Sequence, residues 1–273
     1  MKVIIFLAIA FNVISAKAHD NTEAIYLGNE AVMVSSGSSK IIFDPLFHND
    51  FNIYQKVPQP ILDKLFANEA PYDNLDAIFI SHAHGDHFAA DLIFRYLLSF
   101  PQVQLFGPTQ AIDQIKDLDQ AKKLSKQLHP ITLAYKDPAK KLEMKNLYID
   151  VVRIPHSGWP NNRADVSNLL YRVTLDDSVT VIHMGDADPN DVHFYPYDDL
   201  WKSRQTDISF PPYWFYMSAF GPGIIENGLN TRESIGIHVP VEVPEALTNS
   251  GKQYFSKPGE KKVLAHKHQQ SDS

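Results

Sequence analysis

The 273-residue chain contains no cysteine. Disulfide bonds are therefore excluded, and so is a lipid anchor attached to an N-terminal cysteine. Thiolates are also excluded as metal ligands. A metal site in this chain would have to use imidazole and carboxylate groups, which are the other ligands that zinc prefers.

Basic residues are fewer than acidic ones. The chain has 25 Lys and Arg against 32 Asp and Glu, which gives a net charge of −7. Proteins that bind nucleic acids depend on basic patches that contact the phosphates. We therefore expect no nucleic-acid partner, and we expect a small-molecule substrate instead. The composition indicates nothing about the oligomeric state.

No hydrophobic run reaches the length of a membrane span. The first run, residues 3–16, is interrupted by Asn12, whereas a span needs about 20 apolar residues. A membrane anchor and a buried first helix are two interpretations of this run. The charged start Met1-Lys2, the short apolar run and the Ala16-Lys17-Ala18 site favour a third, a secretory signal peptide.

Cleavage after Ala18 would leave residues 19–273 as the mature chain, which we expect to form a single domain. The protein would then be exported to the periplasm or secreted, without a membrane anchor. Loss of Lys2 and Lys17 would change the net charge from −7 to −9. The basic, glutamine-rich end is expected to be frayed from about residue 261.

Short β-rich segments alternate with amphipathic segments along the chain, which is typical of an α/β architecture. Strands are expected at residues 24–27, 31–35, 40–43, 78–80, 103–106, 142–144, 147–154, 169–175, 179–184, 207–210 and 235–239. Helices are expected at 59–66, 89–100, 191–204 and 109–128, the last with a possible break near Asp117.

Three histidines and an aspartate follow the apolar segment 78–80 within six residues, as His82, His84, Asp86 and His87. In an extended loop, alternation would direct His82, His84 and Asp86 to one side. Imidazole and carboxylate groups are suitable zinc ligands. The alternative is a polar loop that is rich in histidine by chance.

Three more candidate ligands stand at the ends of later predicted strands: His156, Asp186 and His238. Each of them taken alone would be ordinary, because single histidines and Gly-Asp turns are common. A sheet, however, brings the corresponding ends of its strands together. Seven ligand-competent side chains at four strand ends would suit two metal ions.

These motifs resemble those of the metallo-β-lactamase superfamily in its dinuclear form, over roughly residues 24–239. Asp44 resembles the first motif, Ser81–His87 the second, His156 the third, Gly185-Asp186 the fourth and His238 the fifth. The resemblance implies an αββα four-layer sandwich with the metals at a shared edge of two sheets. It also implies one zinc on His82, His84 and His156, a second on Asp86, His87 and His238, and Asp186 bridging both. Iron and manganese are further possibilities.

Two zinc ions would hold a bridging hydroxide that cleaves an ester, lactone or phosphodiester bond of a small substrate. Asp86 is the candidate catalytic residue that takes the proton and passes it to the leaving group. The bridging Asp186 and the absence of cysteine resemble lactonases and phosphodiesterases more than β-lactamases. The alternatives are a β-lactamase, a non-hydrolytic iron redox enzyme and a zinc-binding protein without turnover.

Other polar and aromatic residues are open to two interpretations. Asp44 either caps its loop or supports the metal site, and His183 is expected in the core or behind the metal ligands rather than among them. His48 and His193 either line a cleft or lie on the surface. Trp159 and the segment 213–216 form an aromatic rim for a substrate or pack between the halves of the fold, and the aromatic segment 47–74 is a lid or part of the core.

Overall fold

The structure, a computed structural model, describes residues 22–264. The predicted signal peptide lies outside these residues, so cleavage after Ala18 stays a prediction. Across residues 22–264, the structure contains no helix of the length and apolarity needed to cross a membrane. The prediction that the chain is frayed from about residue 261 is wrong for the first four residues, because Lys261–Leu264 forms strand β13 and pairs with β1.

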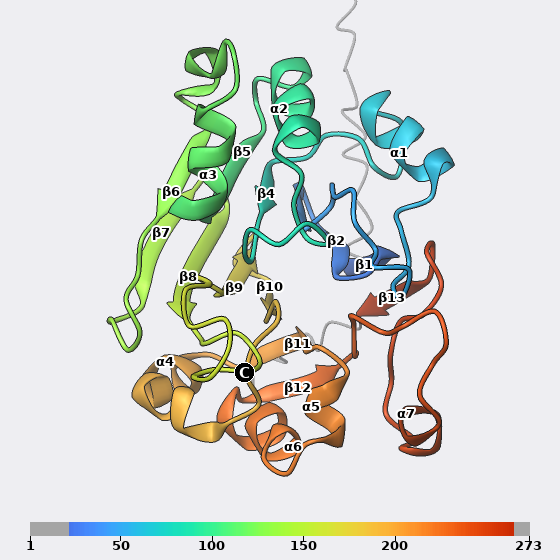
Figure 1. Ribbon diagram of the computed structural model, residues 1–273, viewed down its shortest axis with the longest axis vertical. Coiled ribbons are helices and arrows are strands. Elements are labelled where there is room, and N and C mark those ends of the chain that lie inside the picture. Colours follow the sequence, from blue (N-terminus) through green and yellow to red (C-terminus); the bar gives the residue numbers. More distant parts are fainter. Residues whose placement is uncertain (1–21, 265–273) are drawn as a thin grey trace, which may run out of the picture.

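Two mixed sheets form the centre of the molecule (Figure 1). The first has the order β13 (Lys261–Leu264), β1 (Thr22–Gly28), β2 (Ala31–Ser36), β3 (Ser39–Phe43), β4 (Ala77–Phe79), β5 (Gln104–Pro108), β6 (Leu128–Ile131). The second has the order β12 (Thr231–Ser234), β11 (Thr206–Phe210), β10 (Val179–His183), β9 (Leu169–Leu175), β8 (Leu147–Arg153), β7 (Lys140–Met144).

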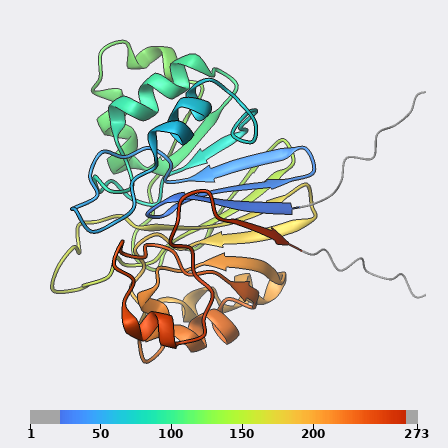
Figure 2. The same ribbon diagram turned by 90° about the vertical axis from the view of Figure 1, so that its right-hand side faces the viewer.

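Helices cover the outer face of each sheet, as Figure 2 shows from the side. The first sheet carries α1 (Gln59–Phe66), α2 (Ala90–Ser99), α3 (Thr109–Lys116) and the 3₁₀ turn η1 (Ala121–Leu124). The second carries η2 (Asp191–His193), η3 (Tyr195–Tyr197), α4 (Asp198–Ser203), α5 (Trp214–Met217), α6 (Gly221–Gly223) and η4 (Ile224–Gly228), with α7 (Glu245–Asn249) near the C-terminal end. The expected αββα sandwich is confirmed.

Alternation along the strands assigns side chains to the layers. In β4, Ala77 and Phe79 belong to the core between the two sheets, whereas Ile78 belongs to the core beneath α1, α2 and α3. Successive side chains of a strand point to opposite faces, and both faces of this strand are covered. A continuous apolar strand such as Ala77–Phe79 is therefore the expected sequence at this place.

Several element boundaries differ from the sequence-based expectations. The helix predicted at 109–128 ends at Lys116; Gln120 has a positive φ of 65°, and Leu128–Ile131 is strand β6. The helix predicted at 191–204 is divided into η2, η3 and α4, where Pro196 cannot donate a helical hydrogen bond. Residues 235–239 form only isolated bridges, and the polar edge strand β12 before them lacks the alternation that predicts a strand.

The strand directions bring the candidate ligands to one edge. Strands β3 to β6 are parallel, and so are β10, β11 and β12. Strand β8 has the same direction as β10, because both are antiparallel to β9 between them. The carboxyl ends of parallel strands meet at one edge of a sheet. The loops after β3 and β4 therefore lie at one edge of the first sheet. The loops after β8, β10 and β12, which carry His156, Asp186 and His238, lie at one edge of the second sheet.

Candidate metal centre

The loop after β4 is fixed by bonds to both sheets. Asp44, which has a positive φ of 41°, accepts a hydrogen bond from the Ser81 backbone N–H (2.8 Å) and another from the Ser81 hydroxyl. The Ser81 carbonyl accepts a bond from Leu169 N–H in the second sheet (2.8 Å). Asp44 also lies 3.0 Å from His87 Nδ1. It therefore holds the loop and one candidate ligand at the same time.

The first cluster consists of His82, His84, His156 and one oxygen of Asp186. His84 Nδ1 lies 3.0 Å from His82 Nε2 and 3.2 Å from His156 Nε2. Asp186 Oδ2 lies 3.1 Å from His156 Nε2 and 3.9 Å from His82 Nε2. The loops of His156 and Asp186 adjoin, since Ser157 N–H donates to the Asp186 carbonyl (2.7 Å).

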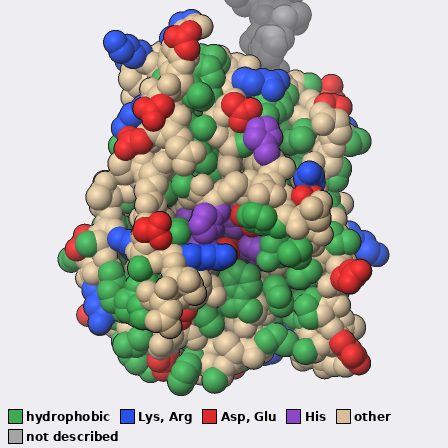
Figure 3. Space-filling view, in the orientation of Figure 1, with side chains coloured by type: hydrophobic (Ala, Val, Ile, Leu, Met, Phe, Trp, Pro, Cys, Tyr) green, Lys and Arg blue, Asp and Glu red, His purple; other side chains and the backbone are tan. Residues whose placement is uncertain are grey.

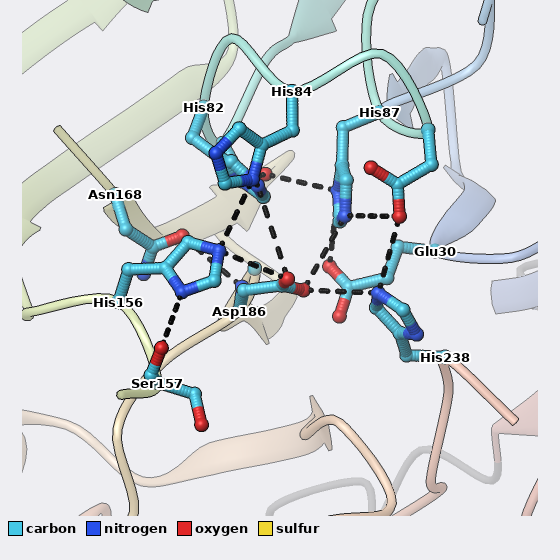
Figure 4. A network of polar contacts seen from close by, with 12 residues as sticks. Glu30, His82, His84, His87, His156, Ser157, Asn168, Asp186 and His238 are labelled. Atoms are coloured by element: carbon cyan, nitrogen blue, oxygen red, sulfur yellow. Dashed lines mark hydrogen bonds and ion pairs between the residues drawn. The ribbon is translucent and has the colours of Figure 1, made fainter. Parts of the chain in front are cut away.

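The second cluster consists of Asp86, His87, His238 and the other oxygen of Asp186. Asp186 Oδ1 lies 3.3 Å from His87 Nε2 and 3.2 Å from His238 Nε2. Asp86 Oδ2 lies 3.5 Å and 3.6 Å from the same two nitrogens. Figure 4 shows Asp186 between His156 on one side and His87 and His238 on the other. The structure thus brings all seven candidate residues together.

The donor atoms fit two metal ions. Ligand atoms at about 2.0–2.1 Å from a zinc ion lie roughly 3.3 Å from one another, which is close to most of the separations in both clusters. His87 Nε2, His238 Nε2 and Asp186 Oδ1 are buried and have no hydrogen-bond partner among the described residues. Such orphaned buried atoms are rare, and a cation would satisfy all three.

The protonation of the first cluster also suits a metal. Burial lowers the pKa of His82 well below its usual range, and the nearby His87 lowers it further. Burial likewise lowers the pKa of His84. Both imidazoles are therefore neutral near pH 7, which is the form that binds a metal ion.

Comparison with known proteins agrees with this architecture. Residues 23–195 match the model of the beta-lactamase superfamily domain. The chain belongs to the beta-lactamase superfamily. No curated protein sequence is significantly similar to it.

Solved structures show the same fold. The metallo-beta-lactamase fold protein YhfI from Bacillus subtilis has 19% identity and a TM-score of 0.58, over 89% of this chain and 99% of that chain. A possible metal-dependent hydrolase from Veillonella parvula has 13% identity and a TM-score of 0.62, over 89% and 100%. A CmlA beta-hydroxylase variant has 14% identity and a TM-score of 0.52, over 90% and 54%. These similar structures thus include a possible metal-dependent hydrolase and a beta-hydroxylase.

The candidate ligands of this beta-lactamase superfamily member are held by a second layer of bonds. His156 Nδ1 donates to the Ser157 carbonyl (2.8 Å), and Asn29 donates to the Asp86 carbonyl (2.9 Å). The Asn168 carbonyl oxygen accepts a bond from Asp186 N–H (3.1 Å), while its amide donates to two backbone carbonyls. Partners of this kind orient metal ligands and tune their basicity.

Glu30 is a buried carboxylate at this site that the sequence did not indicate. Both of its carboxylate oxygens are buried without a hydrogen-bond partner. Its Oε2 lies 3.7 Å from His87 Nδ1 and 3.7 Å from His183 Nε2. Burial raises the pKa of Glu30 well above its usual range. The one signal in the sequence is an acid between two apolar β-segments, and it is indistinguishable there from a turn residue.

The remaining histidines lie outside both clusters. His183 is buried, stacks on Phe43 with ring centres 4.7 Å apart, and donates to the Glu30 carbonyl (2.9 Å), as expected for a core residue. His193 is buried and lies 2.8 Å from the Tyr135 hydroxyl. His48 is exposed and pairs with Asp91. Neither His48 nor His193 lines the cleft at the metal centre.

An open cleft of about 390 Å³ adjoins both clusters. Figure 3 shows histidines in a hollow near the centre of this face, with basic and hydrophobic side chains beside them. Its lining residues are Phe51, Ile53, Tyr54, His84, Gly85, Asp86, Arg163, Asp186 and His238. The segment 47–74 thus contributes to the cleft.

The aromatic residues that line this cleft are not the ones expected from the sequence. Trp159 packs against Tyr135 and His193, with ring centres 5.2 Å away in each case. Trp214 contacts His238 edge-on and donates to the Ala187 carbonyl. Neither tryptophan is among the residues that line the cleft. The aromatic residues that do line it, Phe51 and Tyr54, come from the segment before α1.

Proposed function

We propose that this protein is a dinuclear zinc hydrolase that cleaves an ester, lactone or phosphodiester bond of a small substrate. The observation that carries the proposal is Asp186, whose two oxygens face two separate clusters of ligand atoms. His82, His84 and His156 would hold one ion, and Asp86, His87 and His238 the other. When bound, the two ions supply a water of lowered pKa and an electrophile for the oxygen of the scissile group.

Asp86 is the proposed proton acceptor. It lines the cleft beside the second cluster, and Asn29 fixes its backbone. Burial alone would raise the pKa of Asp86, but the electrostatic influence of the neighbouring His87 and His238 holds the pKa of this carboxyl below its usual range in the metal-free protein. The carboxylate is therefore ionised near pH 7. It can accept a proton at the cleft and return it to a leaving group.

The open cleft supports a hydrolase over a zinc-binding protein without turnover. A storage site needs no access for a substrate, whereas here Asp86, Asp186 and His238 line a cleft of about 390 Å³. A net charge of −7 supports a small substrate over a nucleic acid. β-Lactam hydrolysis remains an alternative within the same reaction class.

Iron or manganese could take the same ligands, because imidazole and carboxylate groups suit these metals as well. A redox enzyme with iron is the alternative from a different class. The metal content of protein purified without added metal separates the two proposals. Iron at two ions per chain, together with oxygen-dependent turnover and no hydrolysis, would contradict the zinc hydrolase.

Export is proposed separately, from the charged start, the short apolar run and the Ala16-Lys17-Ala18 site. The N-terminal sequence of protein recovered from the periplasm or the medium tests it. A mature chain that begins at His19 is the expected result. An uncleaved chain that remains in the cytoplasm would contradict the proposal.

The test of the hydrolase is a screen of the zinc-loaded protein against lactones, aryl esters, bis-aryl phosphodiesters and a β-lactam. His84→Ala should abolish turnover, because the imidazole belongs to the first cluster and lines the cleft. His48→Ala is the matched control, since His48 is an exposed histidine outside the cleft. Failure of the fully zinc-loaded protein on every substrate would contradict the proposal, and a preference for RNA or DNA would contradict the small substrate.

A further inference from the structure

One arginine in the described chain has no partner and stands at the metal cleft. Arg163 lines the cleft, and it also lines an adjoining hollow with Ser157, Gly158 and Asn162. Its guanidinium makes no ion pair or hydrogen bond within residues 22–264. Each of the other arginines has a partner. Arg153 donates to the Leu133 carbonyl, and Arg95 lies over the Phe66 ring. The three others that have partners are Arg172, Arg204 and Arg232.

The backbone that carries Arg163 is held on its C-terminal side. The Arg163 carbonyl accepts a bond from Val166 N–H (3.1 Å), and the Arg153 guanidinium donates to the Val166 carbonyl (3.2 Å). The Gln110 side chain bonds to the backbone of the residues on either side of Val166, at 2.7 and 2.9 Å. Arg163 itself has a positive φ of 61°.

The position of Arg163 gives the cleft a positive end close to the first cluster. Arg163 lines the cleft together with His84, which belongs to the first cluster. The other charged side chains that line the cleft are the acids Asp86 and Asp186. This guanidinium therefore gives the cleft a local preference for an anionic group, although the net charge of the chain is −7.

An apolar surface also lines this cleft. Phe51 is 51% exposed and Ile53 is 49% exposed, although both are large hydrophobic residues. Both belong to the segment between β3 and α1 and line the cleft together with Tyr54. The lining of the cleft therefore combines reactive ligand atoms, one unpaired cation and an apolar surface.

We propose that Arg163 binds an anionic oxygen group of the substrate, a carboxylate or a phosphate, while an apolar part of the substrate contacts Phe51 and Ile53. The guanidinium presents parallel N–H donors that match two oxygens of either group. The substrate would then be a small anionic ester or lactone whose charged group is distinct from its reacting bond. This inference rests on the proposed hydrolase and specifies its substrate class.

The kinetic test compares a neutral aryl acetate with two esters that bear a free carboxylate or a phosphate. Arg163→Met keeps the length of the side chain and removes its charge. We expect kcat/KM to fall about 10–100-fold for an anionic ester, mainly through KM, and to change less than about threefold for the acetate. Arg163→Lys should restore part of the loss. The anionic ester whose kcat/KM falls further in Arg163→Met shows whether a carboxylate or a phosphate is the preferred group.

Arg204→Met is the matched control, because Arg204 is exposed and pairs with Asp177 away from the cleft. It should leave both kinds of ester unaffected. The inference would be overturned if kcat/KM in Arg163→Met fell equally for neutral and anionic esters. It would also be overturned if kcat/KM fell for neither. Thermal unfolding of each variant shows whether the fold is intact.

A binding measurement separates this inference from the proposed function. Phenylacetate and phenylphosphonate are titrated into zinc-loaded wild-type protein and Arg163→Met, with calorimetry as the readout. Binding that weakens about 10-fold or more in the variant supports the inference even if no ester is turned over. Unchanged binding of both anions contradicts it even if the protein is an active hydrolase.

Discussion

The carboxylate of Glu30 lies 3.7 Å from Nδ1 of His87, and the side chains of both residues are fully buried. The two oxygens of this carboxylate have no hydrogen-bond partner among the described residues. Removing a carboxylate from water without a compensating partner is costly. The proposed cations next to it would provide the missing charge, so Glu30 links the stability of the fold to the metal centre.

Glu30→Gln should therefore stabilise the metal-free protein at pH 8. Burial raises the pKa of Glu30, so the folded protein holds a proton that the unfolded chain releases. The wild-type protein then loses stability as the pH rises above the usual glutamate pKa, and the glutamine variant does not. We expect the variant to gain about 1–3 kcal/mol in urea unfolding at pH 8, and zinc to raise its melting temperature less than it raises that of the wild type.

Glu69→Gln is the control for this comparison, because Glu69 is exposed. It should change the free energy of unfolding by less than about 0.5 kcal/mol. A metal-free Glu30→Gln variant that is no more stable than the wild type at pH 8 would show that the buried carboxylate is compensated inside the protein itself.

His238→Ala should reduce the metal content from two ions per chain towards one. His238 Nε2 contacts only the second cluster, at 3.2 Å from Asp186 Oδ1 and 3.6 Å from Asp86 Oδ2. The first cluster keeps its three histidines, and burial lowers the pKa of His82 and His84, so these remain neutral ligands. Elemental analysis after dialysis against zinc measures the result, with His48→Ala as the matched exposed histidine. Two ions retained in His238→Ala would exclude His238 as a ligand.

Asp86→Asn should lower turnover by about 10²–10⁴-fold with little effect on folding. Asparagine keeps the shape of the side chain and loses the charge that accepts a proton. Asn29 still bonds to the backbone carbonyl of residue 86 (2.9 Å), so the loop keeps its anchor. The metal content must be measured on the same sample, because Asp86 also belongs to the second cluster. A near-normal rate with two bound ions would remove Asp86 from the proton path.

The family, the layers of the fold and the seven converging residues were predictable because each depends on local sequence. The apolar strand β4 (Ala77–Phe79) ends three residues before His82, and the end of a strand fixes the place of the residues that follow it. The convergence is confirmed by the geometry, whereas metal binding by these residues stays a prediction.

Residues whose role depends on tertiary contacts were not predictable. Neither Glu30 nor Arg163 belongs to a sequence motif. Glu30 is notable because its carboxylate is buried without a partner, and Arg163 because its unpaired guanidinium lines the cleft. Trp159 is predicted at the rim of the cleft because it follows His156 closely in the sequence. Its ring instead packs against Tyr135, which is far from it in sequence. A single sequence contains no information on such a pairing.

Gly185 precedes the bridging Asp186 and tests how closely the fold controls the metal centre. Its φ is positive, at 53°, and a Cβ added there would lie 2.4 Å from Asn168 Oδ1 and 2.6 Å from Ser81 Cβ. Asn168 accepts the bond from Asp186 N–H, and Ser81 belongs to the loop of the first cluster. Gly185→Ala should therefore displace Asp186 as well as destabilise the protein.

Gly251→Ala separates these two effects. Gly251 also has a positive φ, at 68°, but a Cβ there would meet nothing within 4 Å. The alanine at 251 should cost only the backbone penalty of about 1–2 kcal/mol and leave two zinc ions bound. The alanine at 185 should cost more in urea unfolding and weaken zinc binding at both positions, because Asp186 faces both clusters with one oxygen each. Equal losses of stability with unchanged zinc affinity in the two variants would show that the close approach of Gly185 to Asn168 and Ser81 does not position the bridging carboxylate.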